Sequence, residues 1–142
     1  MPKVANSLQH SRKSKSKRRR GVAAAEFAVC LPVLVLLVFG SIEASSFIFL
    51  KQSLNVAAYE GIREAIRKGS TDGDATDRAE NILVARNVQG FAVAFPSGDV
   101  ANANRGEEVV IEVSAPTESN SPLAGQFLTN RLLTARVVMV KE

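Results

Sequence analysis

An apolar run from Val22 to Leu50 constrains this chain more than any other feature of its sequence. The run contains two charged residues, Glu26 and Glu43, and its first part has the ~20 residues that a helix needs to cross a bilayer. A signal peptide has a shorter apolar core of about 7–15 residues followed by a small-residue cleavage site, which the sequence after this run matches poorly. The sequence therefore predicts a transmembrane helix over residues 22–45.

Charge is distributed unevenly along the chain. The first twenty residues carry a charge of +8, so that the remainder has a balance of −4 within the overall net charge of +4. A basic segment beside an apolar run is typical of the cytoplasmic flank of a membrane helix, and Arg18, Arg19 and Arg20 are expected to set this orientation. A basic tail can also bind nucleic acid, but the rest of the chain has no base-stacking aromatic residues arranged for that function.

Glu26 interrupts the apolar run shortly after Gly21, and its position requires an explanation. A carboxylate inside the hydrocarbon costs about 2.5–3.5 kcal/mol on insertion scales. In one interpretation, Glu26 lies at the membrane interface and reaches water beside the basic block. In the other, a peptidase cuts after Gly21, so that Val22 carries a new α-amino group about one helical turn from Glu26. The carboxylate can then pair with the ammonium group of a neighbouring subunit.

The segment Arg20-Gly21-Val22-Ala23-Ala24-Ala25-Glu26-Phe27 resembles the N-terminus of type IV pilin-like proteins, in the form found in the tight-adherence (Flp) pilus system. Those proteins have a basic leader that ends in glycine, an apolar helix, and a glutamate at the fifth position after cleavage. The stretch Gln52 to Arg63 is similar to the TadE-like family of minor pseudopilins, with its typical Gln-x-Leu-x-x-Ala-Ala-x-x-Gly-x-Arg pattern. Leu31-Pro32 and Gly40-Ser41-Ile42-Glu43 also match, and the resemblance extends over residues 18–68.

This resemblance implies a minor pseudopilin whose leader, residues 1–21, is removed by a prepilin peptidase between Gly21 and Val22. Glu26 and Phe27 are then expected to guide assembly with other pilin and pseudopilin subunits and with the pilus assembly machinery. The pilus would serve surface adhesion or secretion. The resemblance also implies the bacterial inner membrane, with a cytoplasmic N-terminus and an extracytoplasmic domain, residues 46–142. The competing interpretation is an uncleaved single-pass anchor that carries a small extracytoplasmic binding domain.

The helix is expected to continue beyond the membrane. Apolar residues recur there in steps of three or four, which mark one face of a helix. They are Phe47, Leu50, Leu54, Ala58, Ile62 and Ala65. The sequence therefore predicts one long helix over residues 22–68, with Gly69 as the residue that stops it.

The second half of the chain has the pattern of a short helix and a small sheet. Asp77 and Glu80 fit a capping box, which predicts a helix over residues 77–88, and a turn of helix is expected within 121–133. Three stretches with alternating apolar residues predict strands. These residues are Phe91, Val93 and Phe95, then Val109, Ile111 and Val113, then Ala135, Val137 and Met139. Three antiparallel strands cannot bury a face alone, so they should pack on the long helix in a pilin-like α+β fold.

The residues required for catalysis are absent from the sequence of the predicted domain. The single histidine, His10, lies in the basic tail, and no Gly-rich phosphate loop is present. Asp72, Asp74 and Asp77 are reminiscent of a calcium loop, but the glycine and the closing glutamate of such a loop are missing. We therefore expect neither an enzyme nor a cofactor or metal site.

Overall fold

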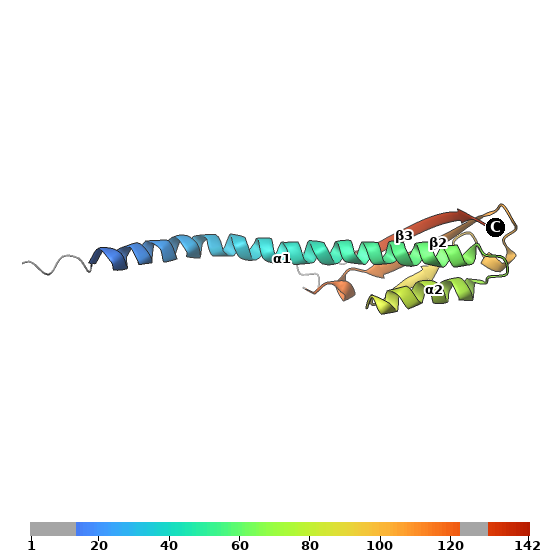
Figure 1. The fold of residues 1–142 in the computed structure, drawn as a ribbon, viewed down its shortest axis with the longest axis horizontal. Helices are drawn as coiled ribbons and strands as arrows, with labels where there is room; N and C mark the ends of the chain where they lie inside the picture. The colour runs from blue at the N-terminus through green and yellow to red at the C-terminus, as the bar shows by residue number, and fades with distance from the viewer. Residues whose placement is uncertain (1–13, 123–130) are drawn as a thin grey trace, which may run out of the picture. The chain divides into compact units, whose positions relative to one another are not determined.

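Residues 14–122 and 131–142 are described by the computed structural model of the chain (Figure 1). Side chains are described from Gly21 onward within these ranges. The chain divides into two compact units, Met1–Phe39 and Gly40–Glu142. Helix α1, Ser14–Ala65, contributes to both units. In the second unit it packs on a three-stranded antiparallel sheet together with a shorter helix, α2, Asp72–Ala85. The predicted α+β fold is confirmed.

Helix α1 begins earlier and ends earlier than predicted. It starts at Ser14 instead of residue 22, in a Lys- and Arg-rich stretch whose residue types have good helix propensity. At its other end, the amide of Arg67 bonds to the carbonyl of Glu64 at 3.1 Å, a tighter turn that replaces the α-helical pattern. Gly69 follows with a φ of 84°, in the left-handed region that favours glycine, so that it does redirect the chain after the helix.

Helix α2 begins at Asp72, and the predicted capping box at Asp77 is wrong. Thr71 is the N-cap, and its hydroxyl accepts from the amide of Asp74 at 3.3 Å, while the Asp74 carboxylate accepts from the amide of Thr71 at 2.9 Å. This is a capping box with aspartate at its fourth position. The helix ends at Ala85, before the predicted end at residue 88, and Asn87 has a φ of 55° in the turn that follows.

The sheet has the strand order β1-β2-β3. Its strands are Ala92–Ala94, Glu108–Pro116 and Leu132–Val140, and both neighbouring pairs are antiparallel. Two 3-10 turns, Val100–Asn102 and Glu118–Asn120, lie in the connections. The three predicted strands are therefore present, although β1 is shorter than its alternating pattern. The helical turn predicted within 121–133 falls largely on residues 123–130, which lie outside the described part of the chain.

The core of the second unit lies between the two helices and one face of the sheet. Leu54 and Ile62 of α1, Leu83 of α2 and Ile111 of β2 are completely buried there. The closest approach is at Gly61, where an added Cβ would lie 2.8 Å from Cδ1 of Ile111. The apolar stripe predicted from the sequence thus faces the sheet, and a glycine allows α1, α2 and β2 to meet.

The end of the chain is attached to the end of α1. The buried ammonium group of Lys141 donates to the carbonyl of Ala65 at 2.7 Å and to that of Val100 at 3.2 Å. The amide of Glu142 donates to the carbonyl of Ile66 at 3.2 Å. A cation at the C-terminus of a helix is favoured by the helix dipole. These contacts fix the direction of β3 along α1.

Candidate functional site

The residues expected to carry processing and assembly all lie on α1 within the first unit. Val22 and Phe27 are 56% and 59% exposed, and Gly21 and Glu26 are exposed as well. Glu26 follows Val22 by four residues, so the two side chains lie on the same face of the helix, one turn apart. The structure thus places these residues together on one accessible segment. The side chains of Arg18, Arg19 and Arg20 lie outside those that it describes.

Gly21 has space around it on α1. Apart from its chain neighbours and the backbone of its own helix, no heavy atom of the described residues lies within 4 Å of the position that a Cβ would occupy. A larger side chain at this position would therefore fit the helix without a clash. The peptide bond between Gly21 and Val22 lies inside α1, so a peptidase that binds an extended substrate must first unwind this turn. Glycine lowers the cost of such unwinding, because it is a poor helix former.

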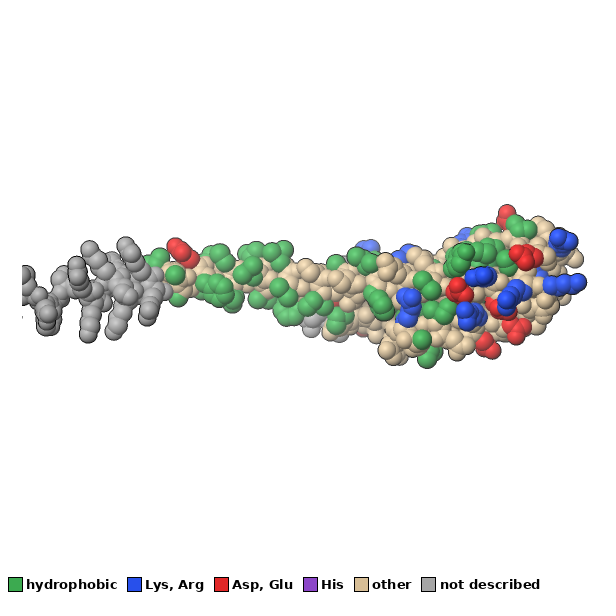
Figure 2. Space-filling view, viewed as in Figure 1, with side chains coloured by type: hydrophobic (Ala, Val, Ile, Leu, Met, Phe, Trp, Pro, Cys, Tyr) green, Lys and Arg blue, Asp and Glu red, His purple; other side chains and the backbone are tan. Residues whose placement is uncertain are grey.

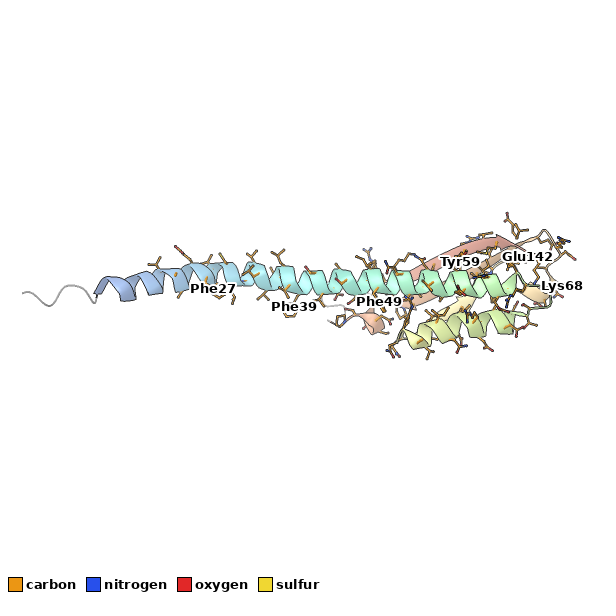
Figure 3. All side chains as sticks on the ribbon, viewed as in Figure 1. Phe27, Phe39, Phe49, Tyr59, Lys68 and Glu142 are labelled. Atoms are coloured by element: carbon orange, nitrogen blue, oxygen red, sulfur yellow. The ribbon has the colours of Figure 1, made fainter. Side chains whose placement is uncertain are left out.

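Apolar side chains surround α1 between Val22 and Ile42, and all of them are exposed (Figure 2). Phe27 and Phe39 project away from the helix into the surroundings (Figure 3). Within the described residues, one helix is long and apolar enough to cross a membrane, and its most apolar part is not buried by the protein. Soluble proteins rarely expose a continuous apolar surface of this size. The helix therefore fits a single-pass membrane protein.

Glu26 is the acidic residue within this apolar surface, between Val22 and Ile42. Its carboxylate has no hydrogen-bond or ion-pair partner among the described residues. A carboxylate in hydrocarbon requires a positive partner or access to water. The segment is therefore chemically suited to bind a cation supplied by another molecule. Cys30 is also exposed on this helix and, as the single cysteine of the chain, has no internal disulfide partner.

Glu43 is a buried acidic residue whose role the sequence did not reveal. It is 6% exposed, and its Oε2 accepts a hydrogen bond from the hydroxyl of Ser121 at 2.7 Å. The helical spacing could have predicted that Glu43 is buried, because Glu43 lies on the same face of α1 as Phe47, Leu50 and Leu54. The buried stripe therefore begins one turn earlier than its apolar residues indicate.

The aspartates around the start of α2 serve local structure. Asp72 accepts a hydrogen bond from the amide of Val100 at 2.6 Å, and Asp74 belongs to the capping box. The hydrogen bond from the amide of Thr71, followed by that from its hydroxyl, lowers the pKa of Asp74 below its usual value. In the part of the chain that the structure describes, no three His, Cys, Asp or Glu side chains form a metal-binding group.

Comparison with known proteins bears on the same segment of α1. A family model described as TadE-like protein matches residues 21–63. The match begins at Gly21 and ends at Arg63, so it contains both the candidate span and the Gln52 to Arg63 motif. No curated protein and no solved structure matches the chain. Over residues 21–63 the chain is therefore similar to TadE-like proteins, and the resemblance to this family of the tight-adherence pilus system is confirmed for that segment.

Proposed function

We propose that this chain is a minor pseudopilin that is cleaved after Gly21 and assembled through α1 into a tight-adherence pilus for surface adhesion or secretion. The observation that carries the proposal is the exposed carboxylate of Glu26 on an apolar helix, one turn from the bond between Gly21 and Val22 and without a partner among the residues that the structure describes. The family match supports it, since the matched segment starts at the glycine expected to end the leader.

Electrostatics explains why cleavage and assembly are coupled. Before cleavage, the basic leader holds the N-terminus in the cytoplasm, in the inner membrane of a bacterium. Removal of the leader by a prepilin peptidase leaves an ammonium group on Val22 at the edge of the apolar surface. This ammonium and the Glu26 carboxylate of a neighbouring subunit are both costly in lipid when isolated. Their pairing offsets both costs, so assembly with other pilin and pseudopilin subunits is favoured only for the processed chain.

We also infer that the chain acts by assembly and not by catalysis. The single histidine, His10, belongs to the proposed leader, which leaves the mature chain without an imidazole base. An open hollow of about 760 Å³ beyond the end of α1 is lined by residues that include Ser70 and Lys141. The Ser70 hydroxyl donates to the Glu64 carboxylate and the Lys141 ammonium donates to backbone carbonyls, so the two are not paired as a nucleophile and its base. These observations support a subunit whose partners are lipid and other proteins.

One observation favours a second candidate, an uncleaved membrane anchor for an extracytoplasmic binding domain. The bond between Gly21 and Val22 lies within the regular hydrogen-bonding pattern of α1. Helical bonds are poor protease substrates unless the helix unwinds locally. In an anchor of this kind, Glu26 would remain at the membrane interface beside the basic block.

The mass of the protein recovered from native membranes distinguishes the two candidates. The proposed function predicts a chain that begins at Val22, and the substitution Gly21→Leu should leave the leader attached. Gly40→Leu is the matched control, because Gly40 is also on α1 with no atom within 4 Å of a Cβ position. That control should be processed like the wild type. A wild-type chain that keeps residues 1–21 under native expression contradicts the proposed function and supports the anchor.

A further inference from the structure

Strand β3 is an edge of the sheet (Figure 1), and two hydrogen bonds show which of its backbone groups face outward. Just before the start of β3, the carbonyl of Arg131 accepts from the amide of Thr117 at 2.9 Å. Just after its end, the amide of Lys141 donates to the carbonyl of Glu107, also at 2.9 Å. Residues bonded to the neighbouring strand alternate in an antiparallel pair, so the odd-numbered residues of β3 face β2. The even-numbered residues direct their N–H and C=O groups to the open side. They are Leu132, Thr134, Arg136, Val138 and Val140.

This outward edge is almost free of partners. The Nζ of Lys51 donates to the carbonyl of Thr134. Among the described residues, no other hydrogen bond reaches the outward backbone groups. Leu132 and Val140 are 67% and 52% exposed, and the strand has nine residues in uninterrupted register, without proline or a bulge. Proteins usually protect long edges with such devices, because an open edge is a template for another strand.

We propose that β3 is a docking edge to which a strand of a different protein adds, with alternating apolar side chains and an acidic residue opposite Arg136. Two side chains at this edge, Lys51, which donates to the carbonyl of Thr134, and Arg136, are basic. The Arg136 side chain is 61% exposed, and its contact with Glu112 is loose, at 3.9 Å. Strand addition of this kind derives affinity from main-chain hydrogen bonds and specificity from alternate side chains.

The sheet already contains an example of the strand that would fit. On the other side of β3, strand β2 places Glu112 opposite Arg136 and Val110 opposite Val138. An acidic and apolar strand on the open side would repeat this pattern. Oppositely charged and apolar pairs that lie across from each other stabilise sheets, whereas like charges destabilise them.

Charge and direction both argue against a second copy of this chain. Two β3 strands in full antiparallel overlap would place Arg136 directly opposite Arg136, and a parallel pair in register would place the two arginines side by side. The contacts of Lys51 with Thr134 and of Lys141 with Ala65 also show that β3 runs in the same direction as this part of α1. An antiparallel pair would therefore point the two α1 segments in opposite directions, which does not suit two chains inserted the same way in one membrane.

The inference does not depend on cleavage after Gly21, so its failure is distinguishable from failure of the proposed function. The first test uses the full chain in detergent micelles and a fluorescent peptide with the sequence of residues 108–114, Glu-Val-Val-Ile-Glu-Val-Ser. We expect saturable binding together with slower hydrogen exchange at the amides of Arg136, Val138 and Val140. A peptide in which lysine replaces the glutamate of position 112 should bind the wild-type chain at least tenfold more weakly. The Arg136→Glu variant should instead bind the lysine peptide more tightly than the glutamate peptide.

Two substitutions at one outward position test the edge directly. Val138→Pro removes an outward N–H group without removing a hydrogen bond to β2, and we expect at least a tenfold loss of peptide affinity. Val138→Glu is the second variant, with Val84→Glu as its control, since Val84 is 63% exposed on α2. Only the substitution in β3 should weaken binding. Absence of saturable binding, or equal losses for both glutamate variants, overturns the proposal.

The second test is carried out in native membranes. The amides of Arg136, Val138 and Val140 should exchange more slowly there than in the purified chain, and unchanged exchange contradicts the proposal. In a Cys30→Ala background, Arg136→Cys tests for a second copy by mild oxidation, because position 136 would lie next to itself in either the antiparallel or the parallel pair of β3 strands. A disulfide-linked dimer of this chain in the membrane identifies a second copy at the edge and overturns the assignment to a different protein.

Discussion

The carboxylate of Glu43 in α1 accepts a hydrogen bond from the hydroxyl of Ser121, 2.7 Å away and 78 residues later in the chain. The carboxylate is buried, so this bond holds α1 against the segment that follows the second 3-10 turn. Glu43→Ala should lower the free energy of unfolding by about 1–3 kcal/mol, because this buried hydrogen bond is lost and a space opens. Glu43→Gln, which keeps an acceptor oxygen, should cost less.

Thermal unfolding of the full chain in micelles, followed by circular dichroism, measures these changes. Glu26→Ala is the control, since Glu26 is exposed on the same helix and should not affect the melting temperature of the second unit. Equal melting temperatures for Glu43→Ala and the wild type would show that the buried hydrogen bond does not stabilise this unit.

Gly61 is expected to be the most restrictive glycine in α1. An added Cβ would lie 2.8 Å from Cδ1 of Ile111, 3.1 Å from Cβ of Ala79 and 3.2 Å from the carbonyl oxygen of Ala75. Gly61→Ala should therefore destabilise the fold by about 1–3 kcal/mol through overpacking. Gly40→Ala, where the Cβ has free space, should be neutral or slightly stabilising, because alanine is the better helix former.

Unfolding by denaturant, compared between these two alanine variants, checks the prediction. The same substitution at both positions gives the same gain in helix propensity, so the difference in unfolding free energy isolates the steric effect. A stabilised Gly61→Ala variant would mean that α1, α2 and β2 can move apart without cost.

The capping box of α2 should make stability depend on pH. Hydrogen bonds from Thr71 lower the pKa of Asp74, so this carboxylate binds protons more weakly in the folded chain than in the unfolded one. Its contribution is then complete above the unfolded pKa of about 3.9 and is lost as the pH falls through the lower folded pKa. Asp74→Asn should reduce the loss of melting temperature between pH 5 and pH 2.

Asp77→Asn is the control for this measurement, because Asp77 is exposed and does not cap α2. It should leave the dependence of melting temperature on pH close to that of the wild type. Thr71→Ala should cost about 1 kcal/mol at neutral pH, as expected for loss of an N-cap. An unchanged pH profile for Asp74→Asn would exclude the capping box as the source of this dependence.

The architecture was predictable because its signals are periodic and local. The stripe that contains Leu54 and Ile62 marks the buried face of α1, and the alternation around Ile111 and Val137 marks two strands. Helix boundaries were less predictable. Two residue pairs fit the same capping pattern, Thr71 with Asp74 and Asp77 with Glu80. The folded chain uses the pair Thr71 and Asp74, because α2 begins at Asp72.

Contacts between distant residues could not be predicted in this way. Ser121 carries no sequence signal that it will meet Glu43, and the open edge of β3 becomes apparent only when the strand order is known. The residues proposed for processing and assembly could be identified from the sequence. Gly21 and Glu26 have the spacing of a leader glycine and a position-five glutamate, and they lie directly after the basic block. Their proposed chemistry involves a peptidase and a neighbouring subunit, so one folded chain cannot display it.

Glu26→Gln should impair incorporation of the subunit into pili while leaving cleavage after Gly21 largely intact. The neutral amide has nearly the same shape as the carboxylate but cannot offset the charge of an ammonium group in lipid. An unpaired charge there costs about 2.5–3.5 kcal/mol, so we expect incorporation to fall by at least tenfold. Glu60→Gln provides the same chemical change in the second unit, where it removes an exposed ion pair with Arg78 and should have little effect. Immunoblots of sheared pili and of membranes give the ratio of assembled to stored subunit for both variants. Wild-type incorporation of the Glu26→Gln subunit would show that this carboxylate has no electrostatic role in docking.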